Sequence, residues 1–304
     1  MNPSQSIKAP PLSVVMASAY SIRDTERCLH ALIQQDPGKE VEIIVVDRCR
    51  EDSIDGVMAK YPHVIFIRFP ENTSLPILWG SGIARSTGRI IAVTDSTSIP
   101  DESWISAILK AHQSPHPVIG GAVEIEPCER WTDWAAYFCE YGQFMRPRVE
   151  GVVEELPGNN VSFKRWVLKR GREYVENGFW KTYWCRKLRQ EGIPLVSVPS
   201  IVVRYNKRYR LLPFIIGRFH HGRCFAGMRI AQASILVRFN YVAGSPGLPM
   251  LFLMRIIRTV ASKRRYIKKF VLVFPITFLA IVSWSVGEFW GYLASPGESC
   301  SKIY

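Results

Sequence analysis

The sequence lacks acidic residues over a long stretch. Residues 204 to 269 contain fifteen lysines and arginines and no aspartate or glutamate, within a chain of net charge +13. The rest of the chain carries 24 basic against 26 acidic side chains, so the basic stretch is a separate feature with its own partner. Apolar runs at 211–216 and 248–254 interrupt the charge, which argues against a nucleic-acid-binding face. Anionic phospholipid headgroups account for both the charge and the apolar side chains.

Cysteine and signal-peptide patterns are also missing. The seven cysteines form no Cys-x-x-Cys pair, and no histidine lies at metal-site spacing. This scatter fits a reducing cytosol and predicts neither a disulfide framework nor a zinc site. The opening residues MNPSQSIKAPP have no apolar core of the kind a signal peptide needs, and we expect residues 1–10 to form a flexible leader.

One long apolar run is present near the end of the chain. Residues 270–287 hold no charge over 18 positions, close to the ~20 residues that span a bilayer. Aromatic residues follow Glu288, as in an interfacial belt, so we predict a basic flank and transmembrane helix at 263–294 and a tail at 295–304. The alternative is a buried core helix. The basic residues at 263–269 place the preceding chain in the cytoplasm by the positive-inside rule, with basic interfacial helices at 207–262.

Apolar, β-branched runs recur in the first half of the chain. They occupy residues 12–17, 41–47, 64–69 and 89–95. Each pair is separated by enough residues for a helix, which indicates an α/β fold with a mostly parallel sheet covered on both faces. Further elements are expected as a helix at 102–113, a strand at 117–127, a helix near 130–145, a short strand and helix within 158–171, a helix within 178–192 and a strand at 193–205. Together these elements define a domain at 11–206.

Residues 84–101 carry the strongest motif. They read as a helix end, a glycine turn, a buried strand and then Asp95, at the strand end where α/β sheets bind ligands. The stretch resembles the nucleotide-sugar-binding segment of inverting family 2 glycosyltransferases, which have the Rossmann-like GT-A fold. That family ends the strand with Asp-x-Asp, whereas this chain has Thr97 at the second position. The resemblance covers residues 10–225. It implies transfer of a sugar from a nucleotide diphosphate-sugar to an envelope glycan or a lipid-linked acceptor.

Three positions are expected to bind the donor nucleotide. Ala19 lies in a turn of small residues that lets the backbone approach a flat base, although an ordinary strand-to-helix turn has the same composition. Asp47 ends a buried strand and can accept a hydrogen bond from a base or a ribose hydroxyl, while a simple cap or turn is the alternative. By the resemblance, Arg85 would neutralise the diphosphate; the alternative is a cation that complements the helix dipole.

The donor sugar and its metal are expected at the next motifs. The resemblance implies that Asn159 and Asn160 contact sugar hydroxyls, while a tight turn is the alternative. Asp95 would hold a Mg²⁺ or Mn²⁺ ion, but Thr97 supplies a hydroxyl instead of the second carboxylate. We therefore expect weakened metal affinity or metal-independent donor binding.

The catalytic base departs from the family pattern. Aligning the helix end at 187–192 places Lys181 where the family has an acid, and Glu176 is a nearby carboxylate upstream. Glu176 could act as the base, or an already ionised phosphate on the acceptor could make a base unnecessary, or the chain could be inactive. Tyr205 replaces a histidine that often joins the family's metal site. Lys181 could then neutralise the diphosphate in place of a metal.

A basic segment follows the expected catalytic domain. Arg218, His221 and Arg223 resemble the helix that lies near the diphosphate and the bilayer in membrane-bound members of the family. Nonspecific headgroup binding is the alternative. The rival to an active enzyme is a pseudo-glycosyltransferase, a membrane-anchored binding or scaffold subunit that accompanies an active partner subunit.

Overall fold

The fold is described from a computed structural model of the chain, which covers residues 9–36, 40–49, 54–231 and 233–303. Residues 1–8 of the predicted leader lie outside these ranges. The chain divides into two compact units. The first comprises residues 1–122 and 148–204, and the second comprises residues 123–147 and 205–304.

The described residues form a mixed sheet in the order β3-β2-β1-β4-β8-β6-β9-β5, with β7 paired to β9. The strands are β1 (Leu12–Ser18), β2 (Glu42–Asp47), β3 (Ile65–Arg68), β4 (Ile90–Asp95), β5 (Ser98–Pro100), β6 (Val118–Ile125), β7 (Gly151–Val153), β8 (Val161–Lys164) and β9 (Leu195–Tyr205). Strands β1 to β4 pair in parallel, as predicted. Strand β8 then runs antiparallel to both β4 and β6. The apolar runs thus form the expected strands, and the antiparallel part extends them.

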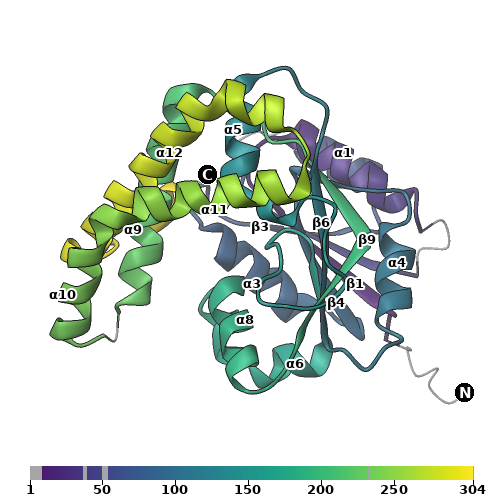
Figure 1. The fold of residues 1–304 in the computed structure, drawn as a ribbon. Coiled ribbons are helices and arrows are strands. Elements are labelled where there is room, and N and C mark those ends of the chain that lie inside the picture. The colour runs from purple at the N-terminus through teal and green to yellow at the C-terminus, as the bar shows by residue number, and fades with distance from the viewer. Residues whose placement is uncertain (1–8, 37–39, 50–53, 232, 304) are drawn as a thin grey trace, which may run out of the picture. The chain divides into compact units, whose positions relative to one another are not determined.

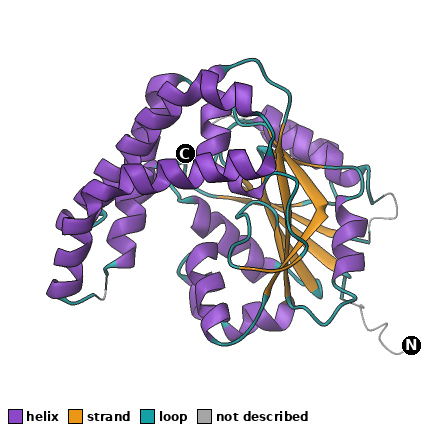
Figure 2. Ribbon diagram, in the orientation of Figure 1, coloured by secondary structure: helices purple, strands orange, loops and turns teal. Residues whose placement is uncertain are grey.

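Helices cover both faces of the sheet in the first unit (Figures 1 and 2). They are α1 (Ile22–Ile33), α2 (Ile54–Lys60), α3 (Leu75–Arg85), α4 (Trp104–Ala111), α6 (Arg165–Arg170), α7 (Arg172–Glu176) and α8 (Lys181–Gln190). Helices α1 and α4 lie on one side, and α3, α6 and α8 lie on the other. Alternate residues of β1 serve the two faces, and Val15 belongs to the core shared with Ile83 of α3 and Trp184 of α8.

One glycine is required by a close approach of two strands. A β-carbon on Gly121 of β6 would lie 1.8 Å from the carbonyl oxygen of Ile201 in β9. Only glycine leaves room for this contact. The side-chain amide of Asn160 donates to the same Ile201 oxygen, so this point of the sheet is fixed by both packing and hydrogen bonding.

The second unit is mostly helical. Its helices are α5 (Trp131–Glu140), α9 (Leu211–Arg229), α10 (Ile235–Gly244), α11 (Leu248–Lys263) and α12 (Ile267–Ala294), with 3₁₀ turns at Gly142–Phe144, Ser245–Gly247 and Gly297–Lys302. The helix predicted near 130–145 therefore ends earlier, at Glu140. Helix α12 is long and apolar enough to cross a membrane by length and composition.

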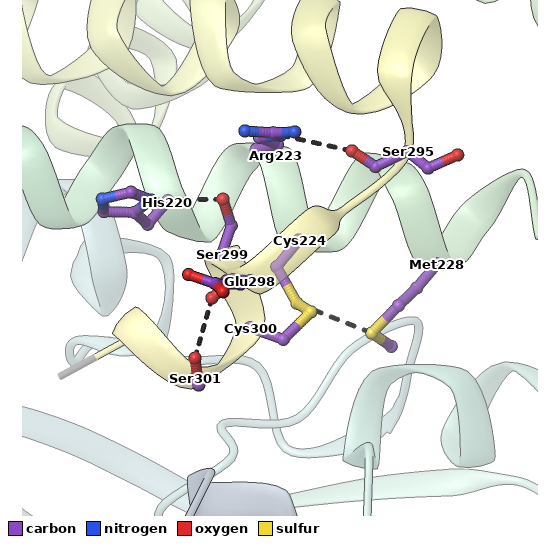
Figure 3. Close-up of a disulfide and its surroundings, with 9 residues drawn as sticks. All are labelled: His220, Arg223, Cys224, Met228, Ser295, Glu298, Ser299, Cys300 and Ser301. Carbon is purple, nitrogen blue, oxygen red and sulfur yellow. Dashed lines mark hydrogen bonds between the residues drawn. A yellow bond between two sulfur atoms is a disulfide. The ribbon is translucent and has the colours of Figure 1, made fainter. Parts of the chain in front are cut away.

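The expectation of unpaired cysteines is corrected at one position. Cys224 of α9 forms a disulfide with Cys300, in the turn after α12 (Figure 3). The two residues are 76 positions apart, so no short motif could reveal the pair. The other five cysteines form no disulfide in the structure.

Candidate active site

Two carboxylates flank the end of β1. Ser18 pairs with Asp47 in the β1–β2 register, and Ala17 pairs with Asp95 in the β1–β4 register. Both acids therefore lie at the carboxyl edge of the parallel strands, as predicted, where such sheets bind ligands.

Asp47 has one satisfied and one open carboxylate oxygen. Ser18 donates its hydroxyl to Asp47 Oδ1 at 2.6 Å. Asp47 Oδ2 is buried without a hydrogen-bond partner, and the guanidinium of Arg68 approaches it only to 3.9 Å. A buried carboxylate oxygen without a donor is costly, so a hydrogen bond to this atom from a ligand N–H or hydroxyl group would be favourable.

Asp95 closes a turn instead of pointing freely at the ligand edge. Its Oδ1 accepts hydrogen bonds from the Thr97 amide at 2.9 Å, the Thr97 hydroxyl at 2.6 Å and the Ser98 hydroxyl at 3.0 Å. The hydroxyl that replaces the family's second acid is thus directed at Asp95. Asp95 is held in place by its own turn.

This donor set fits a divalent cation poorly. Mg²⁺ and Mn²⁺ sites are built on carboxylates and phosphate oxygens, and one Asp95 oxygen is already used by three donors. Across the described ranges, no group of three or more His, Cys, Asp or Glu side chains could hold a metal ion.

The two asparagines that were expected to bind sugar differ in their surroundings. Asn160 donates to the carbonyl oxygens of Ala122 and Ile201 and accepts from the indole of Trp104. Asn160 is buried and has no N–H group left to donate to a sugar hydroxyl, which corrects the expectation of a sugar contact at Asn160. Asn159 donates to Ser98 Oγ at 2.8 Å, while its buried Oδ1 has no partner. Asn159 is thus joined to Asp95 through Ser98 and keeps an open acceptor.

Arg85 does not join this group. It ends α3, which precedes β4, and the neighbouring residues Thr87 and Gly88 bond to Glu42 and Ser13 at the beginnings of β2 and β1. Arg85 is exposed near the amino edge of the sheet, opposite to Asp47 and Asp95. The expected contact between Arg85 and the diphosphate is therefore corrected. Helix α3 runs from the carboxyl edge to the amino edge of the sheet, and β4 then leads back to Asp95 at the carboxyl edge.

The start of α3 lies closer to the site. The indole of Trp79 donates to the carbonyl oxygen of Thr94 at 2.7 Å, next to Asp95. Ala19 and Trp79 both pack against a core cluster that includes Leu78. Trp79 was missed by the sequence analysis because no motif distinguishes it from a core tryptophan.

Two polar residues directly after the strand ends were also not assigned as site residues. Ser96 Oγ is buried without a hydrogen-bond partner, next to Asp95. Arg48 follows Asp47 and donates to the carbonyl oxygen of Thr73 at 2.5 Å, which ties the end of β2 to the loop before α3. The sequence feature that could have identified Ser96 and Arg48 is that each directly follows a strand-end aspartate.

Lys181 reaches the loop that carries Asn159. Its ammonium group donates to the carbonyl oxygen of Leu156, and a β-carbon on Gly158 would lie 3.7 Å from Lys181 Cε. Burial lowers the pKa of Lys181, although the charges of Cys185 and Glu155 oppose this shift. Lys181 is therefore a partly buried cation beside the loop that carries Asn159.

Glu176 has a different environment. It ends α7, is half exposed, and accepts a hydrogen bond from Arg172 at 2.5 Å. This is an i,i+4 surface pair. The role of Glu176 as a base remains a prediction.

The three basic residues expected near the diphosphate and the bilayer have partners within the second unit. The guanidinium of Arg218 lies 4.2 Å above the Trp284 ring and 3.7 Å from Glu140. The His221 ring lies 4.7 Å from Trp284, and burial together with the charge of Arg218 lowers the pKa of His221 to about 3. Arg223 donates to the carbonyl oxygen of Ser295 at 3.2 Å.

Tyr205 stands where the family often has a histidine. Its hydroxyl donates to Glu140 at 2.6 Å. Burial raises the pKa of this hydroxyl well above its ordinary value, and the Glu140 charge adds to the effect. Tyr205 is thus a neutral hydrogen-bond donor inside the second unit.

Comparisons with known proteins agree with this architecture. The succinoglycan biosynthesis protein ExoO of Rhizobium meliloti (strain 1021) is 35% identical over 99 residues, which is 32% of this chain and 28% of that relative. The mannosyltransferase PcManGT from Pyrobaculum calidifontis, solved in complex with GDP-Man and Mn²⁺, has a TM-score of 0.56 at 16% identity, covering 93% of this chain and 88% of that one. This likeness confirms the GT-A fold. The sequence model described as glycosyl transferase family 2 matches residues 13–169, more than half of the chain. The chain therefore belongs to glycosyl transferase family 2.

Proposed function

We propose that this chain is a membrane-associated enzyme that transfers a sugar from a nucleotide diphosphate-sugar to an envelope glycan or a lipid-linked acceptor at the cytoplasmic face. The observation that carries the proposal is the set of buried, unpartnered oxygens at the carboxyl edge: Asp47 Oδ2, Ser96 Oγ and Asn159 Oδ1. Three such atoms near one sheet edge match a ligand rich in hydroxyl and N–H groups.

The donor would lie along this edge with its parts assigned to different residues. Asp47 would accept a hydrogen bond from the base or the ribose. Asn159 would contact sugar hydroxyls, because its position is fixed through Ser98 and Asp95. Lys181 would place its positive charge near the diphosphate, beside the Asn159 loop.

The transfer would be a direct displacement. An acceptor oxygen forms a bond to the anomeric carbon of the sugar while the bond from that carbon to the diphosphate oxygen breaks. The nucleoside diphosphate leaves with the electron pair, and the anomeric configuration inverts. The Lys181 ammonium would stabilise the charge that develops on the leaving diphosphate.

The acceptor nucleophile fits an ionised phosphate. Such an oxygen needs no base, which agrees with a lysine at the family's acid position and with Glu176 held in a surface pair. A neutral sugar hydroxyl would instead need Glu176 as a base. The basic stretch and the apolar helix α12 favour an acceptor that is presented by a membrane.

The second candidate is a pseudo-glycosyltransferase that binds the donor or a partner subunit without turnover. It is favoured by the substitutions at Thr97 and Lys181. Thermal-shift measurements with UDP-, GDP- and TDP-sugars, with and without Mn²⁺, test both candidates. Stabilisation by one nucleotide sugar, together with release of its nucleoside diphosphate when polyprenyl phosphate is added, supports the enzyme. Stabilisation without release supports the pseudo-enzyme, and no stabilisation by any donor rejects the proposed site.

A further inference from the structure

Helix α12 has two faces of opposite character. Buried positions recur along one face and include Phe270, Val273, Ala280, Ser285 and Glu288. The other face exposes large apolar side chains along the whole helix. These are Val271, Leu272, Phe274, Phe278, Leu279, Val286, Trp290 and Leu293. An exposed apolar strip of this length marks an interaction surface.

The first half of α12 is packed against α5. The rings of Phe270 and Phe138 lie edge to face at 5.3 Å, and the ring of Tyr266, the residue before α12, lies 4.8 Å from that of Trp134. The Lys269 ammonium is 5.7 Å from the same Trp134 ring. The beginning of α12 is therefore part of the folded unit and does not stand apart as an isolated membrane anchor.

The second half of α12 is packed against α9. Ser283 donates to the carbonyl oxygen of Ile215 at 2.7 Å. A β-carbon on Gly287 would lie 2.1 Å from the carbonyl oxygen of Phe219, so these two helices touch backbone to backbone. The contacts run from Ile215 and Ser283 to Phe219 and Gly287, so the residue numbers increase in the same direction along both helices, and α9 and α12 run parallel.

This packed interface is charged. Glu288, almost fully buried, accepts hydrogen bonds from Tyr292 at 2.5 Å and from Arg229 of α9 at 3.5 Å. Arg218 of α9 stacks on Trp284. If α12 crossed a bilayer, α9 would carry these arginines into the hydrocarbon beside it, where charged side chains are strongly disfavoured.

The residues after α12 return to α9. Figure 3 shows Arg223 bonded to the carbonyl oxygen of Ser295, His220 bonded to Ser299 at 3.2 Å, and the Cys224–Cys300 disulfide. The tail is thus held along the helix that packs on α12. A tail released on the far side of a membrane would require α9 to cross as well.

We infer that α12 lies in the plane of an anionic bilayer leaflet, with its exposed face from Val271 to Leu293 inserted among the acyl chains, and that it does not cross the membrane. The exposed cations Arg264, Lys268 and Lys269 at its start then meet the anionic headgroups. A second copy of this basic chain would instead repel these cations. The inference rests on the membrane association in the proposed function. It replaces the spanning helix expected from hydropathy.

Depth measurements along α12 test this orientation. A fluorescent amino acid is placed, one position at a time, at Val271, Leu279, Val286 and Leu293 of the full chain, and each protein is reconstituted with vesicles of phosphatidylcholine and phosphatidylglycerol. Lipids that carry a nitroxide near the headgroup or near the chain end then quench the label. The same label at Lys187, an exposed residue of the first unit, is the control.

We expect the shallow nitroxide to quench all four α12 labels more than the deep one, and the control label to respond to neither. Stronger deep quenching at Leu279 and Val286 than at the two ends would show a crossing helix and overturn the inference. Absence of quenching with dimerisation in lipid-free buffer would also overturn it, because a second copy would then cover the face. Donor binding measured on the same samples reports the transferase site separately, so its loss would reject the proposed function without changing the depth profile.

Discussion

Ser18 and Asp47 join the ends of β1 and β2 through a 2.6 Å hydrogen bond that leaves Asp47 Oδ2 open and buried. The serine holds the carboxylate at the carboxyl edge of the parallel strands, where a nucleotide would lie. Substitutions at Ser18 and at Asp47 therefore test different properties of the carboxylate. A change at Ser18 affects its position, and a change at Asp47 affects its charge.

Asp47→Asn removes the charge and keeps an oxygen for Ser18. We expect the affinity for the nucleotide sugar to fall by about ten- to a hundredfold, because a hydrogen bond to a charged group contributes about 1.5–3 kcal/mol. Ser18→Ala should weaken binding less, since the carboxylate remains. Titration calorimetry measures both, and Asp55→Asn, an exposed acid of α2, is the control. Equal affinities for the two asparagine variants would remove Asp47 from the site.

Lys181→Met tests whether a lysine has taken over the role of a metal. The substitution keeps an unbranched side chain of nearly the same length and removes the charge beside the Asn159 loop. We expect donor affinity measured in EDTA to drop by at least about tenfold, from the loss of a charge-assisted contact. Lys187→Met, in the same helix but in a surface pair with Glu191, should bind like the wild type. An unchanged Lys181→Met variant rejects the lysine-for-metal hypothesis.

The same hypothesis predicts a pH dependence. Only the ammonium form of Lys181 attracts a diphosphate, and burial lowers its pKa below the ordinary value of 10.5. When the pH rises through this lowered pKa, Lys181 loses its charge. Donor binding should therefore begin to weaken at a lower pH than it would if the lysine were exposed and had its ordinary pKa. The wild-type affinity should fall across the alkaline range, whereas Lys181→Met should show a flatter profile there.

The position of Asp47 and Asp95 could be predicted from the sequence, and that of Arg85 could not. Parallel strands that alternate with helices must end at one edge, so the acids after 41–47 and 89–95 were placed together correctly. Arg85 is only ten residues from Asp95 in the sequence. Because α3 ends at the opposite edge of the sheet, however, the two residues lie at opposite ends of β4. Asn159 and Asn160 are neighbours with different partners, and only the fold reveals which amide is already used. The Cys224–Cys300 pair depends on how α9 and α12 pack, which no spacing encodes.

Thr97→Asp restores the second acid of the family motif. The change removes a hydroxyl that donates to Asp95 and puts a second negative charge at the same turn. We expect donor binding to become dependent on Mn²⁺, because two carboxylates and the diphosphate oxygens then form a suitable ligand set. Without the ion, like-charge repulsion should lower the melting temperature of the variant. Affinities that do not respond to EDTA in this variant would show that the missing acid is not what weakens the metal site.

His112 should make the first unit sensitive to acid. Its ring is buried, lies 2.8 Å from Ser162 Oγ, and has a pKa lowered to about 4 by burial and by the charge of Lys164. Between pH 6.5 and about 4 the unfolded chain binds a proton that the folded chain does not, so stability should decrease as the pH falls, by about 1.4 kcal/mol per pH unit for one proton. His112→Gln keeps a hydrogen-bonding group for Ser162 and removes the titration. Denaturant unfolding of the detergent-solubilised protein across this range should show a shallower slope for the variant, and parallel slopes would mean that His112 is protonated equally in both states.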